Sequence, residues 1–295
     1  MRLDRRDFLK GALAALASPR IRAQQTAGRL TDKITVLDGG GANVVAFSAS
    51  DGVVLVDSGT PSSGDKLKAA LNARVQTLFN THYHLDQTGN NEMFAAAGAK
   101  IIAHERTRQW MSAAYWVPSE DRYEKARPKA ARPTETFLAN GSLKAGAEQI
   151  DYGYLTLAHT SGDIYVYFKT SNVLAVGDVA SPLRDPSLDY FTGAWIGGRV
   201  DAMDLLLKLS NDQTKIVPAY GPVMTKAELK AERDVMEEVR ARLFKQVREG
   251  DGPKDMLEAG VLNGLARTWK DPYKFLYDAA KGLWGHHNKL DPNVV

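Results

Sequence analysis

Cysteine is absent from this 295-residue sequence. The chain therefore cannot form disulfides, supply thiolate ligands to a metal or use a cysteine nucleophile. The absence also fits an oxidising compartment, where stray thiols are a liability. Any tight metal site in the protein must consequently be built from histidine, aspartate, glutamate or water.

A global excess of positive charge is missing from the body of the chain. The formal net charge is +3, but residues 1–23 alone carry six basic and two acidic side chains. The remaining residues have a net charge of −1, so the composition predicts no nucleic-acid partner. Hydrophobic residues make up 44% of the sequence and charged residues 25%, which is ordinary for a globular protein with a sizeable core.

The N-terminus has no apolar run long enough to span a bilayer. It carries instead Arg5 and Arg6, followed by Phe8 and a short apolar run at 11–17. This order of features is the twin-arginine export pattern. We therefore expect residues 1–23 to be a signal peptide that is recognised by the twin-arginine export machinery and then cleaved. The mature protein is expected to be periplasmic or secreted, without a stable membrane anchor; the alternative is an amphipathic N-terminal helix.

Two groups of strands with accompanying helices follow the leader. Apolar and β-branched runs predict strands at 34–37, 43–48, 53–57, 75–80, 100–103, 136–138, 149–157, 164–169, 173–176 and 215–218. Helical spacing predicts helices at 62–72, 92–97, 105–114, 201–210, 225–248 and in the tail at 254–283. Two strand-rich halves favour an α/β fold of two sheets packed face to face with helices outside. We expect one domain at 28–250 and a packed helical extension at 251–295.

The sequence has only six histidines, and two of them form a distinctive pair. His82 and His84 directly follow the predicted buried strand at 75–80. In an extended chain, residues i and i+2 point to the same side, and Asp86 continues that face. Two histidines and a carboxylate at the end of a strand predict a metal site. The alternative is a pair of ordinary polar loop histidines.

Two further candidates stand after strands in the second half of the chain. His159 follows the strand predicted at 149–157, and Asp178 follows the one at 173–176. Alone, each has an ordinary structural explanation, because polar residues at strand ends commonly complete turns or cap helices.

Taken together, these segments resemble the metallo-β-lactamase superfamily. The segment His82-x-His84-x-Asp86-Gln87 resembles the family's H-x-H-x-D-H loop. The matching later motifs are Asp57-Ser58-Gly59, Ala158-His159-Thr160, Gly177-Asp178 and Pro218-Ala219-Tyr220-Gly221-Pro222. The resemblance runs from about residue 34 to 222 in the family's order. It implies a four-layer αβ/βα sandwich with the metal site at one edge of the sheets.

The resemblance implies one complete metal site and one damaged site. His82, His84 and His159 match the ligands of the first metal, and three imidazoles with a water form an open zinc site. The second site keeps Asp86 and Asp178, but Gln87 and Tyr220 stand where the family has histidines. Amide and phenol oxygens are weak zinc ligands, so we expect one zinc per chain and an empty or weak second site.

The chemistry implied is hydrolysis of a small-molecule substrate. Zinc lowers the pKa of bound water toward about 7 and makes a hydroxide available. Asp86 and Asp178 are then candidate proton acceptors, and Tyr220 is a candidate donor to a developing oxyanion. The expected substrate carries an ester, thioester, amide or lactam bond.

Two alternatives to this hydrolase remain open at the level of sequence. One branch of the family holds a single iron with two histidines and an aspartate and oxidises thiols. His82, His159 and Asp178 match that set, with Fe²⁺ as the cofactor. The other alternative is a non-catalytic protein that binds a metal or ligand at a degenerate site.

Two segments allow more than one interpretation. The basic, proline-containing segment at 116–133 is predicted to be a solvated loop, or else a lid that favours anionic substrates. The aromatic and glycine-rich segment at 190–198 is either a pocket wall or a place where Trp195 packs in the core. His104 is expected to cap the helix that follows it, and His286 and His287 are not expected to be ligands.

Overall fold

The computed structural model of the protein describes residues 28–117 and 121–286. The predicted signal peptide at 1–23 and His287 lie outside these ranges. Within them, no helix is both long and apolar enough to cross a membrane.

The first sheet has seven strands in the order β1-β2-β3-β4-β5-β6-β9. The strands are β1 (Gly28–Arg29), β2 (Ile34–Asp38), β3 (Asn43–Ser48), β4 (Val53–Val56), β5 (Val75–Phe79), β6 (Lys100–His104) and β9 (Glu135–Phe137). The first four run antiparallel to one another, whereas β4, β5, β6 and β9 are parallel. The carboxyl ends of these parallel strands therefore meet at one edge of the sheet, and the segment with His82 and His84 leaves β5 there.

The second sheet has five strands in the order β10-β11-β12-β13-β14. They are β10 (Asn140–Ala145), β11 (Glu148–Tyr154), β12 (Ile164–Phe168), β13 (Val173–Gly177) and β14 (Lys215–Pro218). The first four are antiparallel, and β14 pairs in parallel with β13. Because β13 ends at Gly177, Asp178 begins the loop that leaves this sheet.

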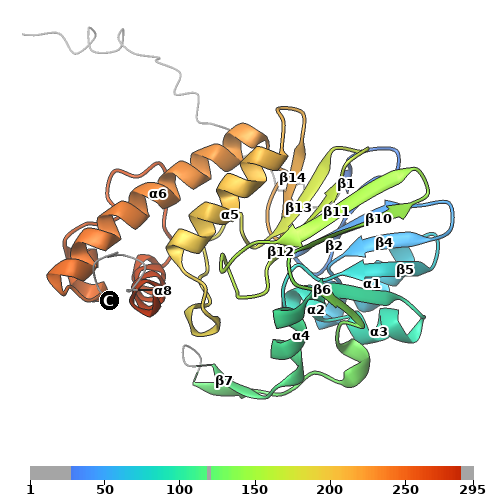
Figure 1. The fold of residues 1–295 in the computed structure, drawn as a ribbon, viewed down its shortest axis with the longest axis horizontal. Helices are drawn as coiled ribbons and strands as arrows, with labels where there is room; N and C mark the ends of the chain where they lie inside the picture. The colour runs from blue at the N-terminus through green and yellow to red at the C-terminus, as the bar shows by residue number, and fades with distance from the viewer. Residues whose placement is uncertain (1–27, 118–120, 287–295) are drawn as a thin grey trace, which may run out of the picture.

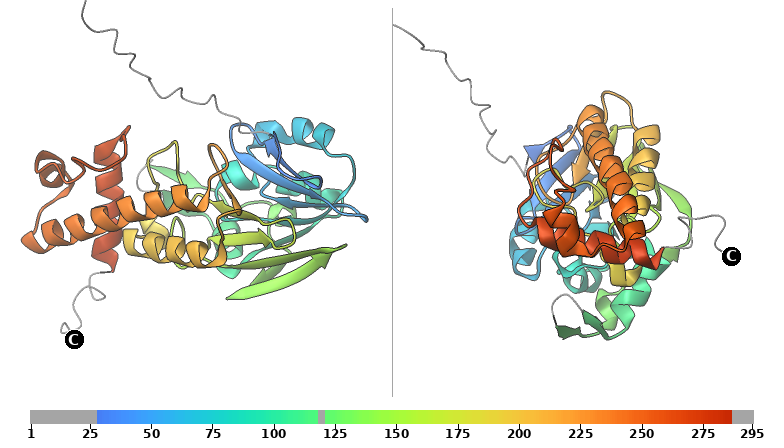
Figure 2. Two further views of the ribbon diagram at one scale, coloured as in Figure 1. Left: turned by 90° about the horizontal axis from the view of Figure 1, so that it is seen from above. Right: turned by 90° about the vertical axis from the view of Figure 1, so that its left-hand side faces the viewer.

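Helices cover the outer face of each sheet (Figures 1 and 2). The helices longer than a single 3-10 turn are α1 (Gly64–Ala70), α2 (Leu85–Thr88), α3 (Asn91–Ala96), α4 (Glu105–Ser112), α5 (Ile196–Leu209), α6 (Lys226–Glu249), α7 (Pro253–Glu258) and α8 (Pro272–Gly285). The ribbon shows α5 and α6 side by side, with α8 crossing near their ends.

Three apolar clusters separate the layers. Along β3, Val45 and Phe47 pack between the two sheets, whereas Val44 and Ala46 face the cluster under α1 and α3. This division follows from the alternation of side chains along a strand. A third cluster joins the second sheet to α5, α6 and α8. The predicted four-layer αβ/βα sandwich is thereby confirmed.

Several predicted boundaries were wrong. The segment at 116–133 is not wholly loop, because β7 (Tyr115–Val117) and β8 (Arg122–Glu124) form a hairpin. Strand β10 was missed, since most of its side chains are exposed or half-exposed and its core signal is weak. The tail at 254–283 is interrupted, with α7 and α8 separated by turns.

Helix α5 begins at Ile196, five residues before its predicted start. Gly197 and Gly198 concealed this start, because glycine disfavours helix interiors. The structure explains both glycines by close packing. A Cβ at Gly197 would lie 2.2 Å from the Trp195 ring, and one at Gly198 would lie 2.3 Å from a backbone oxygen.

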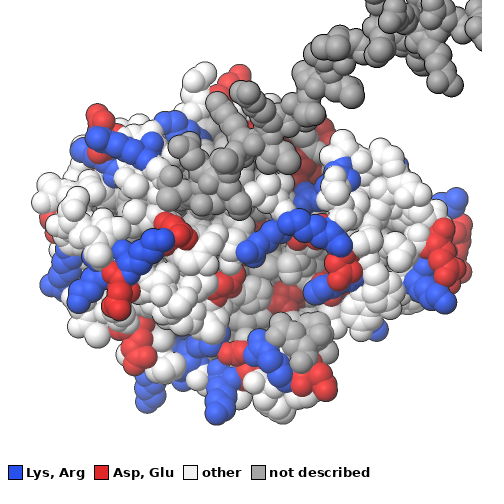
Figure 3. All heavy atoms as spheres, turned by 180° about the vertical axis from the view of Figure 1, so that it is seen from behind, with Lys and Arg blue, Asp and Glu red and all other residues white. Residues whose placement is uncertain are grey.

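Charged side chains of both signs are interspersed on the face shown in Figure 3, and they do not gather into one basic area. This distribution agrees with the near-zero net charge of the chain without its first 23 residues.

Candidate metal centre

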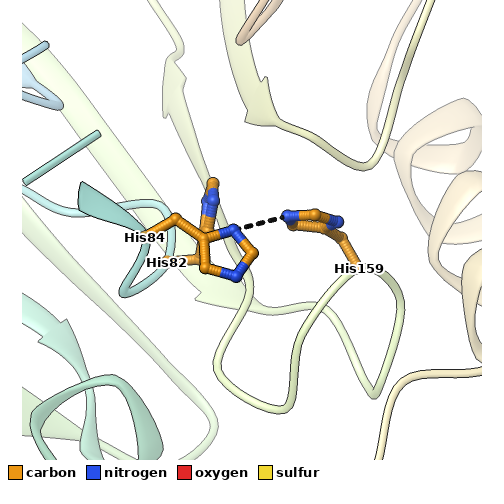
Figure 4. A group of neighbouring side chains, drawn as sticks. All are labelled: His82, His84 and His159. Carbon is orange, nitrogen blue, oxygen red and sulfur yellow. Dashed lines mark hydrogen bonds between the residues drawn. The ribbon is translucent and has the colours of Figure 1, made fainter. Parts of the chain in front are cut away.

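Three histidines converge at the edge of the two sheets (Figure 4). His82 and His84 follow β5, and His159 lies in the turn between β11 and β12. Each offers a ring nitrogen, and the three nitrogens all lie within 4.8 Å of one another. The closest approach is 3.1 Å, between His159 Nε2 and His84 Nδ1. The predicted three-histidine cluster is therefore present.

Partners on the outer side of two imidazoles fix which nitrogen faces inward. His159 Nδ1 donates to the Ser187 carbonyl at 2.8 Å, which leaves Nε2 as the unprotonated nitrogen. His84 Nε2 lies 3.1 Å from Asp189 Oδ2, which also accepts the Tyr83 hydroxyl. The inward-facing His84 Nδ1 is then free to act as a ligand.

His82 is oriented by a chain of buried hydrogen bonds. Its Nδ1 lies 3.1 Å from Thr81 Oγ1, and that hydroxyl donates to Asp57 Oδ2 at 2.8 Å. Because the hydroxyl proton is used by Asp57, the contact with His82 requires Nδ1 to donate. His82 Nε2 is buried without a hydrogen-bond partner among the described residues.

This donor set fits a metal ion. Three ring nitrogens face one another, and two of them are 3.1 Å apart, an arrangement that a shared cation stabilises. Burial and neighbouring histidines hold the pKa values of His82 and His159 well below the usual range, so both are neutral. Burial lowers the pKa of His84, but the hydrogen bond to Asp189 and the charges of Asp189, Asp86 and Asp178 together raise it above the usual value. A metal ion takes the place of a proton on an imidazole nitrogen, and imidazole nitrogens are ligands that zinc accepts readily.

Asp178 lies against this cluster, as its place after β13 predicted. Its Oδ2 is 3.5 Å from His82 Nε2 and 3.9 Å from His159 Nε2. Burial, and then the charge of Asp86, raise the pKa of Asp178 to about 7. Its carbonyl accepts a hydrogen bond from the fully buried Arg199 at 2.9 Å, which fixes the start of the loop.

Asp86 and Tyr220 meet each other beside the cluster. Asp86 lies in the first turn of α2, so the extended conformation predicted to continue through it was wrong. The Tyr220 hydroxyl donates to Asp86 Oδ2, and the Arg184 guanidinium lies 3.2 Å above the Tyr220 ring. Burial raises the pKa of Tyr220, so the phenol stays protonated at neutral pH. Its proton is directed at Asp86 in this conformation, not at an open substrate position.

Gln87 directly follows Asp86 in the sequence motif, and its side chain is fully buried. Neither its side-chain oxygen nor its nitrogen has a hydrogen-bond partner among the described residues. Its backbone carbonyl accepts the Ser58 amide at 2.7 Å, which ties α2 to the turn after β4. A buried amide without partners retains the capacity to bind water or a ligand.

Ser187 and Asp189, which orient two of the histidines, were not predicted from the sequence. Both lie in the irregular segment between Asp178 and α5, where neither periodicity nor a motif marks them. His104, in contrast, caps α4 as predicted, with Nδ1 accepting the Arg106 amide at 3.3 Å. Trp195 belongs to the apolar core, whereas Phe191 lines a cavity, so the segment at 190–198 serves both predicted roles.

Residues 37–221 match the metallo-beta-lactamase superfamily. The metallo-beta-lactamase IND-1 of Chryseobacterium indologenes is 24% identical over 184 residues, which cover 61% of this chain and 71% of that protein. A metallo-beta-lactamase from Pontibacter korlensis has a TM-score of 0.58 at 19% identity, covering 72% of this chain and 98% of its own.

The structure of a different enzyme with a similar fold overlaps a larger share of this chain. A double mutant of the sec-alkyl sulfatase PisA1 has a TM-score of 0.64 at 12% identity. The overlap spans 88% of this chain but only 50% of the sulfatase. At these identities the structural likeness speaks for the fold alone.

The protein therefore belongs to the metallo-beta-lactamase superfamily. Most of this superfamily are metal-dependent hydrolases, and the cluster of His82, His84 and His159 is consistent with that class.

Proposed function

We propose that the protein is an exported zinc-dependent hydrolase that cleaves an ester, thioester, amide or lactam bond in a small molecule. The observation that carries this proposal is the convergence of three inward-facing imidazole nitrogens, each on a ring that has a partner on its outer side. Zinc bound there would act as a Lewis acid and make hydroxide available near neutral pH.

Residues of the chain supply the proton transfers. Asp178 Oδ2 lies close to two of the ligand nitrogens, so it is placed to take a proton from the attacking water. The same oxygen can return that proton to the leaving group. Tyr220 holds Asp86 through its hydroxyl and so fixes the position of that carboxylate.

Elemental analysis of the mature protein, purified without added metal, tests the proposal first. We expect about one zinc per chain, together with hydrolysis of generic ester or lactam substrates. His84→Ala should lose both metal and activity, whereas His286→Gln, whose ring is bound to the Gly193 carbonyl, should keep them. Metal-dependent hydrolysis in His84→Ala would refute the assignment.

The same measurement decides between the alternatives. His84 Nδ1 points into the cluster with the other two nitrogens, which favours a three-histidine zinc site over a set that leaves His84 out. One iron per chain with thiol oxidation would instead support the oxygenase. One bound metal without turnover would support a non-catalytic binding protein.

Export is a separate part of the proposal and has its own test. We expect the chain to reach the periplasm and to lose residues 1–23. Replacement of Arg5 and Arg6 by lysine should leave the precursor in the cytoplasm, because the twin-arginine machinery reads that pair. Equal amounts of mature protein from both sequences, measured by fractionation, would contradict this route.

A further inference from the structure

A cavity of about 210 Å³ lies beside the metal centre. Both His84 and its partner Asp189 contribute to its lining, so the cavity reaches an imidazole that faces the metal position. The His84 side chain is 29% exposed, whereas the His82 side chain is buried. A group bound in this cavity would therefore contact the ring of one proposed metal ligand, His84, beside its partner Asp189.

Three segments that are distant in the sequence form the walls. They are the paired strands β7 and β8, the segment at 187–191 and helix α8. Figure 1 shows the loop before α5 between α8 and β7. Phe191 links the first two, since its ring lies 6.1 Å from that of Tyr115.

Helix α8 forms one wall of the cavity. It lies outside residues 37–221, the part of the chain that matches the superfamily. Lys274 and Asp278 of α8 face the cavity and are paired at 2.6 Å. The helix is held close to the loop by packing. A Cβ at Gly282 would lie 2.8 Å from the Ala194 carbonyl, so only glycine allows this approach.

The lining favours an uncharged aromatic group. Tyr83, Tyr115, Tyr190 and Phe191 present rings to the cavity. The charged side chains that line it have partners: Lys274 pairs with Asp278, and Arg122 pairs with Glu124. Asp189 Oδ2 accepts the Tyr83 hydroxyl and lies 3.1 Å from His84 Nε2. Aromatic rings pack favourably edge-to-face or offset against one another.

The volume sets the size of the group. An apolar cavity of about 150 Å³ is large enough to hold benzene. The cavity beside His84 therefore has room for one aromatic ring.

We propose that this cavity binds a single uncharged aromatic ring on the non-reacting side of the substrate, and that α8 makes the enzyme selective for it. The preferred substrates are then small esters or amides that carry one aryl group. This inference rests on the proposed hydrolase, because it places the ring relative to a bond cleaved at the metal.

Two measurements on the full mature, zinc-loaded protein test the proposal. The first compares kcat/KM for methyl phenylacetate and methyl acetate. The second measures binding of 4-fluorophenylacetamide by fluorine NMR, with fluoroacetamide as the ringless comparison. We expect a clear preference for the aryl ester and binding of the aryl amide alone.

Three variants test whether residues of the cavity cause the preference for the aryl ester. Phe191→Ala should weaken binding of the aryl amide about tenfold, the value of one aromatic contact, and raise KM for the aryl ester by a similar factor. Val117→Phe should fill the cavity and abolish the preference for the aryl ester. Trp116→Ala is the matched control, because Trp116 lies between two lining residues of β7 but is exposed and packs on Tyr123. Zinc content and thermal melting verify that each variant is folded.

The outcomes separate the two proposals. Hydrolysis of both esters without a preference for the ring, or a preference unchanged by both Phe191→Ala and Val117→Phe, would overturn the assignment of the cavity alone. Turnover of neither ester, with the aryl amide still bound, would overturn the hydrolase and with it the role of the cavity in substrate choice.

Discussion

Thr81 connects two buried groups that have no direct contact with each other. Its hydroxyl donates to Asp57 and accepts from His82, so one side chain both satisfies a buried carboxylate and sets the orientation of a ligand. A hydrogen bond that orients a metal-binding histidine in this way contributes strongly to metal affinity.

Thr81→Val keeps the shape of the side chain and removes the hydroxyl. We expect zinc affinity to fall about 10- to 100-fold, because the His82 ring loses its partner. Competition with a chromophoric chelator measures the change. The control is Thr88→Val, since the Thr88 hydroxyl bonds to backbone carbonyls and not to a ligand ring. An unchanged affinity in Thr81→Val would show that the ring needs no such partner.

Asp57 makes the folded state sensitive to pH. Burial raises its pKa well above the ordinary value, although hydrogen bonds from Thr81 oppose the shift. The folded protein therefore binds this proton more tightly than the unfolded chain does. The resulting stabilisation is complete below about pH 4 and is lost as the pH rises through the folded-state pKa.

Asp57→Asn removes this titration and suits the backbone, because the residue has a φ of 64° and asparagine tolerates that conformation. We expect the free energy of unfolding of the variant to improve relative to the native protein as the pH rises from about 4 to 7. Urea unfolding in the presence of a chelator measures the difference. A constant difference across that range would contradict the prediction.

The second metal position offers the sharpest test of the altered motif. Tyr220 directs its proton at Asp86, and Gln87 contributes an amide. Gln87→His combined with Tyr220→His supplies two imidazoles, so we expect zinc to rise from about one to two per chain. Tyr220→Phe is the control and should stay at one. Elemental analysis showing one zinc in the double variant would mean that other residues block the position.

At the scale of helices and strands, the sequence predicted those features that depend on a local pattern of residues. Most strands, the long α6 helix and the histidines at strand ends follow from apolar runs and from short motifs. The histidine partners could not be predicted in this way. Asp189 meets His84 across 105 positions of sequence, and no local signal records such a contact.

Helix α6 begins where its capping residues predict. Thr225 and Glu228 form a reciprocal capping box, with the Thr225 hydroxyl accepting the Glu228 amide at 3.2 Å. Thr225→Ala should lower the free energy of unfolding by about 1 kcal/mol, whereas Thr225→Ser should change it little. Urea denaturation compares the two, and equal stabilities would contradict a role for the cap.

At the scale of the whole molecule, the residues after 250 share the core of the second sheet. Phe275, Leu276 and Leu283 of α8 are buried in the same cluster as α5 and α6. Arg267 donates to the carbonyl of Ser181 at 2.6 Å and also contacts the Arg184 carbonyl, which ties this tail to the loop after β13.

A fragment that ends at residue 250 should therefore be unstable. Exposing each buried side chain of α8 costs roughly 1.5–3 kcal/mol, which together approaches the whole stability of a typical domain. We expect rapid cleavage of the 28–250 fragment in limited proteolysis, compared with the chain from residue 24. Equal resistance would show that the predicted domain at 28–250 folds without its extension.

Helix α8 also bears on how such a protein changes over generations. The histidines and their partners belong to the stretch shared with the superfamily, whereas Lys274 and Asp278 come from a tail beyond it. Substitutions at these two positions would alter the cavity and leave the ligand residues unchanged. A lineage carrying this architecture is thus free to explore new substrates by changing the face of α8 that borders the cavity, while the residues at the metal centre are kept.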